Sequence, residues 1–171
     1  VVVPFEGLTK DEQLAKPREE IDRGTKAIYD ATFSHDDVFV KADIIVRNRG
    51  YWDLYEVKSS TSVKEHYWDD VAIQYYVLSG CGIPVNKAYL VHINNGYVRE
   101  GDIVPEELFV LQDITGIVKE KQPSIPDTLA EMRAQATLVV KGVTRKAWEG
   151  AEDLKDRYKA AFEELRGAID G

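Results

Sequence analysis

Three charged residues on two neighbouring predicted strands have the types and spacing needed for metal-assisted hydrolysis. Residues 54–60 read Leu-Tyr-Glu-Val-Lys-Ser-Ser, and Asp43 lies thirteen positions before Glu56. Side chains two apart on a strand share a face, so Glu56 and Lys58 point into one small volume. Burying a carboxylate and an ammonium is costly unless they are paired or bind a metal. Carboxylates that hold a divalent cation, with a lysine that orients or activates water, would explain the combination.

A strand hairpin is required to bring these charges together. Apolar residues at alternate positions predict a strand over Val38–Val46 and a returning strand over Tyr51–Lys58, with residues 47–50 as a tight turn. The positions of the first strand expected to face the core are Val38, Val40, Ala42, Ile44 and Val46. Asp43 then lies on the opposite face of that strand.

The register of this hairpin decides whether the acids meet. If the turn holds two or four residues, Val46 is expected to pair with Tyr51, and Asp43 lies opposite Leu54. Glu56 is then the diagonal neighbour of Asp43 on one face, with their Cα atoms roughly 7–8 Å apart. A three-residue loop would move Asp43 to the other face and separate the two acids.

The helix predicted after the hairpin, from about Lys64 to Ser79, carries a polar residue in its apolar stripe. Helical spacing places Gln74 in line with Tyr67, Val71 and Leu78. A buried amide needs hydrogen-bond partners. A phosphate, a metal-bound water or a strand edge would each supply them.

The remaining pattern predicts an α/β fold with a mixed sheet. Thr9 and Glu12 form a capping-box pattern at the start of a helix. Two further segments are predicted to be strands (26–33 and 87–93), and 97–99 a short returning strand. Residues 109–115 are ambiguous, and 127–141 and 144–169 are predicted to be helices. The expected order is helix, three strands, helix, strand and a helical tail with an aromatic stripe that includes Trp148 and Phe162.

Composition limits the classes of protein. The chain has 171 residues, 44% hydrophobic and 30% charged, which suits one globular domain with an appendage. No apolar run approaches the ~20 residues of a membrane span, and a cytoplasmic location is expected. The single Cys81 excludes an internal disulfide and a four-cysteine metal site. The net charge of −8 disfavours non-specific nucleic-acid binding.

The residues described above resemble the PD-(D/E)xK nuclease superfamily, and within it the RecB-like exonucleases, including the CRISPR-associated ones. The matches are Asp43 as the lone strand acid, Glu56-Val57-Lys58 as the (D/E)xK element, and Gln74-Tyr75 on the following helix. From about Ala27 to Val118 the chain is similar to an uncharacterised group of bacterial RecB-like proteins. The similarity covers somewhat over half of the sequence.

The resemblance implies a restriction-endonuclease-like fold, with an αβββαβ core over residues 1–122 and a helical extension over residues 123–171. It implies Mg²⁺ or Mn²⁺ held by Asp43, Glu56 and the Val57 carbonyl, with Lys58 as the catalytic lysine and Gln74 and Tyr75 assisting near the phosphate. The implied activity is metal-dependent hydrolysis of DNA, as a RecB-like exonuclease in repair, recombination or defence. Linear DNA or single-stranded ends would be the substrate. The basic side chains expected to contact it are Lys41, Arg47, Arg49, Lys64, Lys87 and Arg99.

The chain departs from the family pattern in three places. The position four after Gln74, often a tyrosine in RecB-like helices, is Leu78. The first motif, an acid or histidine on an early helix, has only Glu19 and Glu20 as weak candidates, and one option is that it lies upstream of residue 1. The cysteine-rich segment of many relatives has no counterpart, so no iron–sulfur cluster is expected.

Structural roles compete with each functional role. Glu56 and Lys58 could form a surface ion pair, Asp43 a solvated strand acid, Gln74 a satisfied core amide, and Tyr75 a packing residue. His66 and Asp70 are one helical turn apart, and a simple i,i+4 contact is favoured over a ligand pair.

Two functional alternatives follow from these structural roles. In one, the fold is a catalytically inactive module that binds nucleic acid or a partner protein. In the other, the C-terminal helices mediate a homo-oligomer.

Overall fold

The computed structural model describes the backbone of residues 1–3 and 7–148, and the side chains of residues 1–3 and 7–137. The chain divides into two compact units, residues 1–125 and 126–171. The first unit contains the sheet and the predicted site. The second begins within helix α5 (Ile125–Trp148).

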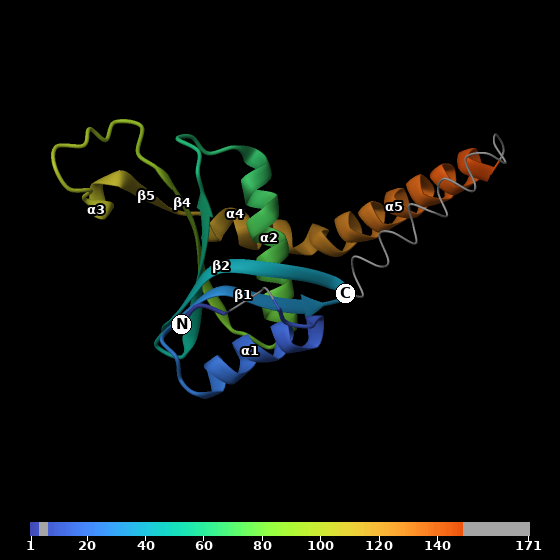
Figure 1. Cartoon of the computed structure of the whole chain (residues 1–171), viewed down its shortest axis with the longest axis horizontal. Helices are drawn as coiled ribbons and strands as arrows, with labels where there is room; N and C mark the ends of the chain where they lie inside the picture. The colour runs from blue at the N-terminus through green and yellow to red at the C-terminus, as the bar shows by residue number, and fades with distance from the viewer. Residues whose placement is uncertain (4–6, 149–171) are drawn as a thin grey trace. The chain divides into compact units, whose positions relative to one another are not determined.

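One five-stranded sheet forms the centre of the first unit, in the order β1-β2-β3-β4-β5 (Figure 1). Its strands are β1 (Ala27–His35), β2 (Val38–Asn48), β3 (Tyr51–Lys58), β4 (Val85–Ile93) and β5 (Phe109–Asp113). Neighbouring strands are antiparallel except β3 and β4, which are parallel. The sheet is therefore mixed, as predicted, although it has one strand more than the core of the expected fold.

Two-residue turns join the first three strands. Asp36 and Asp37 connect β1 to β2, and Arg49 and Gly50 connect β2 to β3. All four have positive φ, between 51° and 88°. This conformation is that of the type I′ turn, whose twist matches the twist of the flanking strands.

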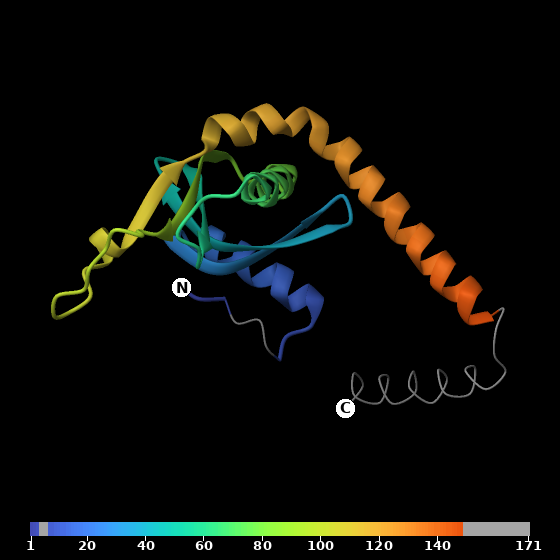
Figure 2. The ribbon, with the colours of Figure 1, turned by 90° about the horizontal axis from the view of Figure 1, so that it is seen from above.

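Helices cover the two faces of the sheet. α1 (Lys10–Asp22) packs on β1, and its N-terminus has the predicted capping box of Thr9 and Glu12. α2 (Glu65–Gly80) makes the parallel crossover from β3 to β4 and lies on the face of the β1–β2 hairpin opposite α1 (Figure 2). α4 (Thr115–Lys121) packs against α2, and a 3₁₀ turn (Gln122–Ser124) follows it.

The buried side chains come from both the sheet and α2. Ile28, Phe33, Leu54, Leu78 and Leu90 are fully buried. Burying each large apolar side chain contributes about 1.5–3 kcal/mol relative to leaving it exposed. The order α1, β1–β3, α2, β4 confirms the αβββαβ core and is consistent with the restriction-endonuclease-like fold.

Three local predictions are corrected or resolved. Residues 97–99 form no strand, because Asn94–Tyr97 is a turn and the chain continues as a loop to α3 (Pro105–Leu108). The ambiguous segment 109–115 is β5, followed by the first residue of α4. The helix predicted over 127–141 belongs to α5, which continues to Trp148; most of the helix predicted over 144–169 lies outside the described residues.

Candidate active site

The β2–β3 register places Asp43 closer to Glu56 than the sequence predicted. The observed pairs are Asn48 with Tyr51 and Ile44 with Tyr55, which is two residues away from the predicted pairing. The turn holds only Arg49 and Gly50, because both adopt positive φ and allow the tightest hairpin. If this pairing is extended by one residue beyond Ile44 and Tyr55, Asp43 lies directly opposite Glu56. The turn holds two residues, so the three-residue loop is excluded, and the shift from the predicted pairing is an even number of residues.

Asp43 lies at an irregularity in β2. Before Asp43 the buried residues are Val40 and Ala42, but after it the buried residue is Ile45, three positions further on instead of two. Ile44 and Val46 are only partly buried, which corrects the prediction that they face the core. On β1 the residue opposite, Asp30, has a φ of 56°. The pairs of β1 and β2 on either side share one register, and Asp30 and Asp43 themselves are not paired. The side-chain alternation of β2 therefore shifts by one residue at Asp43.

The Asp43 carboxylate is fixed against β3. The backbone N–H of Val57 donates to Asp43 Oδ2 at 2.8 Å, just beyond the last β2–β3 pair. Val57 stands between Glu56 and Lys58 in the (D/E)xK element. Asp43 therefore contacts the backbone of the element that it was expected to complete.

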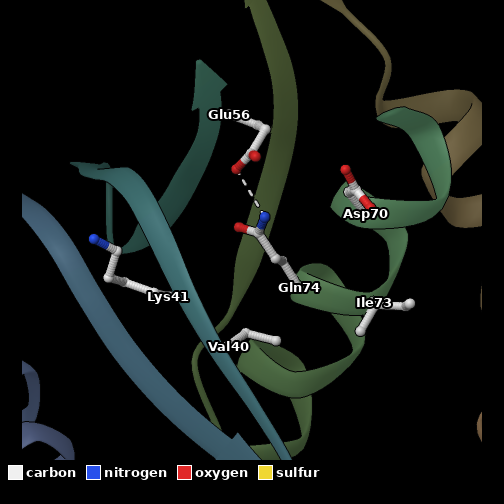
Figure 3. Close-up of a pocket in the computed structure, with 6 residues that line it drawn as sticks. All are labelled: Val40, Lys41, Glu56, Asp70, Ile73 and Gln74. Carbon is white, nitrogen blue, oxygen red and sulfur yellow. Dashed lines mark hydrogen bonds between the residues drawn. The ribbon is translucent and has the colours of Figure 1, made fainter. Parts of the chain in front are cut away.

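Glu56 is anchored from α2. Gln74 Nε2 donates to Glu56 Oε2 at 2.7 Å, and the two residues are only 7% and 8% exposed. No donor among the described residues reaches Gln74 Oε1, which is buried. Figure 3 shows this oxygen directed toward the side of β2 that carries Val40 and Lys41. The amide therefore holds the carboxylate with one end and leaves an acceptor at the other.

A shallow pocket of about 230 Å³ opens beside this pair. Its lining comes from β2, β3 and α2, and consists of Val40, Lys41, Glu56, Asp70, Ile73 and Gln74 (Figure 3). Two carboxylates and the unpaired amide oxygen give one side of the pocket acceptor character. Such a surface favours a cation or a ligand that donates hydrogen bonds.

Lys58 is held between two carboxylates. Its Nζ donates to Glu56 Oε1 at 2.8 Å and to Asp70 Oδ2 at 3.0 Å, and it lies 5.0 Å from the ring centroid of Tyr67. Burial lowers the pKa of Lys58, but the hydrogen bonds and charges of Glu56 and Asp70 outweigh burial and raise it above its ordinary value. Lys58 is therefore a protonated cation at neutral pH.

Asp70 is the site residue that the sequence interpretation missed. It lies four residues before Gln74, so both project from one side of α2 toward β3. That spacing was the signal available in the sequence. The i,i+4 partner considered for Asp70 was His66, but His66 instead makes an edge contact with the Tyr67 ring.

Tyr75 is not brought to the site. Its hydroxyl donates to the Val85 carbonyl at 3.2 Å, and Val85 pairs with Trp52 near the start of β3. Glu56 lies four residues further along that strand. Burial raises the pKa of Tyr75. One residue along a helix is a turn of about 100°, so Tyr75 faces away from the direction taken by Gln74, and its placement favours packing.

The oxygen atoms at this site fit a small divalent cation by their chemistry. Carboxylates of Asp43 and Glu56 and the Val57 carbonyl are hard donors of the type that Mg²⁺ and Mn²⁺ accept. The described residues contain no group of three or more His, Cys, Asp or Glu side chains that could hold a metal. Mg²⁺ commonly takes one or two carboxylates and fills its remaining positions with water and substrate phosphate oxygens, so a two-carboxylate set is sufficient.

Comparisons with known proteins place this chain in no established family. No family model matches, and no curated protein matches. Among solved structures, the chain is similar to an alkaline exonuclease (LHK-Exo) from Laribacter hongkongensis, with 15% identity and a TM-score of 0.42 over 78% of this chain and 70% of that one. It is also similar to the protein SSO0001, with 20% identity and a TM-score of 0.31 over 64% of this chain and 56% of that one.

No helix in the described part of the chain combines the length and apolar character needed to span a bilayer.

Proposed function

We propose that this chain is a divalent-metal-dependent nuclease that hydrolyses phosphodiester bonds in DNA, acting as a RecB-like exonuclease on linear or single-stranded ends. One observation carries the proposal. The Asp43 carboxylate accepts a hydrogen bond from the backbone N–H of Val57, which lies between Glu56 and Lys58. Lys58 in turn donates a hydrogen bond to the Glu56 carboxylate. Two acids and an amine thus meet at one short segment of β3.

Asp43, Glu56 and the Val57 carbonyl would hold Mg²⁺ or Mn²⁺. Such a cation supplies Lewis-acid polarisation of a phosphoryl oxygen and makes a bound water more acidic. The protein positions the donors in advance, because Val57 N–H fixes Asp43 and Gln74 fixes Glu56. Partners of this kind typically change metal affinity or activity by about 10–100-fold when they are removed.

Lys58 would act as a fixed positive charge. Its raised pKa, caused by Glu56 and Asp70, favours a protonated role for Lys58 over that of a general base. A protonated Lys58 would stabilise the negative charge that develops on the phosphorus oxygens, or orient the attacking water through its N–H groups. Asp70 accepts a second hydrogen bond from the ammonium and so limits the directions in which Lys58 can donate.

Cleavage of linear DNA tests this proposal. Purified protein with Mn²⁺ should degrade linear DNA, and Lys58→Ala should abolish the activity. Lys121→Ala is the matched control, because Lys121 also pairs with an aspartate, Asp69, at 2.8 Å but lies outside the site. Absence of cleavage by the wild-type protein with both Mg²⁺ and Mn²⁺ would contradict the proposal.

A catalytically inactive module that binds nucleic acid or a partner protein is the second candidate. The basic surface expected for DNA is partly neutralised, since Lys41 pairs with Asp30 at 2.8 Å and Lys87 with Asp113. The net charge of −8 acts in the same direction. Calorimetry with Mn²⁺ separates the candidates. A catalytic site should bind Mn²⁺ in a way that Asp43→Asn weakens, whereas a degenerate site should bind none.

A further inference from the structure

The two edges of the sheet differ in how they are protected. At the β1 edge, the N-terminal residues run alongside the strand: Tyr29 N–H donates to the Val1 carbonyl, and Val3 N–H donates to the Tyr29 carbonyl. At the β5 edge, no described strand pairs with the outer side of β5. β5 is the outermost yellow strand in Figures 1 and 2. An unpaired strand edge is a template for another strand.

β5 also lacks the features that usually block an edge. Its sequence is Phe-Val-Leu-Gln-Asp, without proline, lysine or a bulge. Phe109 and Leu111 are 44% and 54% exposed. Val57 and Leu111 each lie beside Val91 in the strand pairing, so the exposed apolar surface continues from the edge across β4 to β3. Such a contiguous patch at an open edge marks an interaction surface.

The hydrogen-bonding direction of β5 follows from its contacts with β4. Asn94 N–H donates to the Leu108 carbonyl, and Ile114 N–H donates to the Ala88 carbonyl. In an antiparallel pair, alternate residues direct their backbone groups to opposite sides. Leu111 and Asp113 therefore point their N–H and C=O groups outward, away from β4. The Phe109 carbonyl also points outward, but the Phe109 N–H donates to the Pro105 carbonyl at the end of α3.

We propose that β5 pairs with β5 of a second copy of this chain, in antiparallel register about Leu111, to form a continuous ten-stranded sheet across a two-fold axis. Leu111 then faces Leu111, and Phe109 of each copy faces Asp113 of the other. The Leu111 pair exchanges two hydrogen bonds. In each Phe109–Asp113 pair the Asp113 N–H donates to the Phe109 carbonyl, because the Phe109 N–H is already bonded to the Pro105 carbonyl. An interface in which the same patch pairs with itself is the usual form of a symmetric dimer.

The charges on β5 suit a second copy. Asp113 is the only charged residue of the strand, and it is already paired with Lys87 of its own chain. The two-fold register places it opposite Phe109, so no like charges face each other across the ladder. A five-residue ladder buries well below the ~1,200 Å² of a standard stable interface, so we expect a weak dimer that forms only as the protein concentration rises.

Light scattering across a wide concentration range tests the dimer with the full chain. The wild-type protein should approach twice the mass of one chain as concentration rises. Leu111→Lys should remain at the mass of one chain with an unchanged circular dichroism spectrum. Val98→Lys is the control, because Val98 is also exposed but lies in the loop before α3, and it should behave as wild type. A wild-type protein that stays monomeric, or a folded Leu111→Lys protein that still dimerises, overturns the proposal.

Cross-linking keeps the test decisive if Leu111→Lys fails to fold. Facing residues of a hydrogen-bonded antiparallel pair have Cα atoms about 5.5 Å apart, which is within disulfide range. Leu111→Cys should therefore give a covalent dimer under oxidising conditions, whereas Val98→Cys should not. Equal cross-linking of both variants, or none for Leu111→Cys, overturns the register.

Discussion

Gln74 and Glu56 form a buried hydrogen bond between α2 and β3, with Gln74 Nε2 at 2.7 Å from Glu56 Oε2. Both residues are more than nine-tenths buried. The bond sets the orientation of the Glu56 carboxylate before any ligand arrives. The helix is thus part of the site, although Glu56 and Lys58 belong to the strand.

Replacing this amide tests its positioning role. Gln74→Met keeps the volume of the side chain and removes the hydrogen bond, so we expect Mn²⁺ affinity to fall about 10–100-fold. The free energy of unfolding should fall by about 1–2 kcal/mol, because the bond has a charged acceptor. Calorimetry and urea denaturation measure the two effects.

Gln122→Met is the matched control for this substitution. Gln122 Nε2 donates to the carbonyls of Ala72 and Val118, so its loss should reduce stability without changing Mn²⁺ affinity. Equal metal binding by the wild-type protein and Gln74→Met would remove Gln74 from the site.

Lys58 and a cation compete for the same carboxylate. Lys58→Met removes the ammonium that is bonded to Glu56 and Asp70, so Mn²⁺ should bind more tightly, roughly tenfold or about 1.4 kcal/mol. The same substitution should abolish cleavage, because it removes the positive charge that we propose stabilises the phosphate. Calorimetry and a nuclease assay on one preparation measure the opposite changes. Weaker Mn²⁺ binding by Lys58→Met would refute the competition.

The hairpin shows how far the sequence determines the site. Its alternating pattern correctly predicted the two strands. The pattern gave the wrong pairs, because a two-residue turn and a four-residue turn preserve the same alternation. Only the positive φ of Arg49, which its residue type does not predict, selects the shorter turn.

Other features depend on contacts between distant segments. The shift in β2 requires an irregularity in both β1 and β2, so the alternation of one strand wrongly placed Ile44 in the core. Asp70 was missed because its partner, Lys58, is on another element. Gln74 was recognised as inward-facing from the helix pattern, but its partner, Glu56, becomes clear only when α2 packs on β3.

The pH dependence of stability should reflect Asp113. Hydrogen bonds from Thr115 and the neighbouring Lys87 lower the pKa of Asp113 to about 2. Because this value is below the ~3.9 of an unfolded aspartate, ionised Asp113 stabilises the fold above pH ~4, and this contribution is lost as pH falls toward 2. Asp113 is partly exposed, so solvent screening limits the effect to about 1 kcal/mol or less.

Denaturation of Asp113→Asn and the wild-type protein at several pH values measures this contribution. The difference between them in unfolding free energy should be largest near neutral pH and should shrink between pH ~4 and ~2. A difference that is constant across this range would exclude the ionised carboxylate as its source.

Gly80 at the end of α2 packs against His35. A Cβ atom at this position would collide with the His35 imidazole. Gly80→Ala should therefore lower the free energy of unfolding by about 1–3 kcal/mol, which is the usual cost of overpacking. Thermal or urea unfolding measures the loss.

The same loss can be assigned by a double-mutant cycle. His35→Ala in the Gly80→Ala background should recover most of the stability, because the collision is removed. Additive losses in the double variant would show that the collision is not the cause.

The central claim is that Asp43, Glu56 and the Val57 carbonyl form one cation site. A crystal structure of the protein soaked in Mn²⁺, with anomalous scattering recorded at the manganese edge, tests it most directly. The account predicts an anomalous peak within about 2.0–2.3 Å of oxygens from these three residues, and no such peak in Asp43→Asn. Mn²⁺ bound only elsewhere, or Asp43 and Glu56 oxygens that share no ion at saturating Mn²⁺, would contradict it.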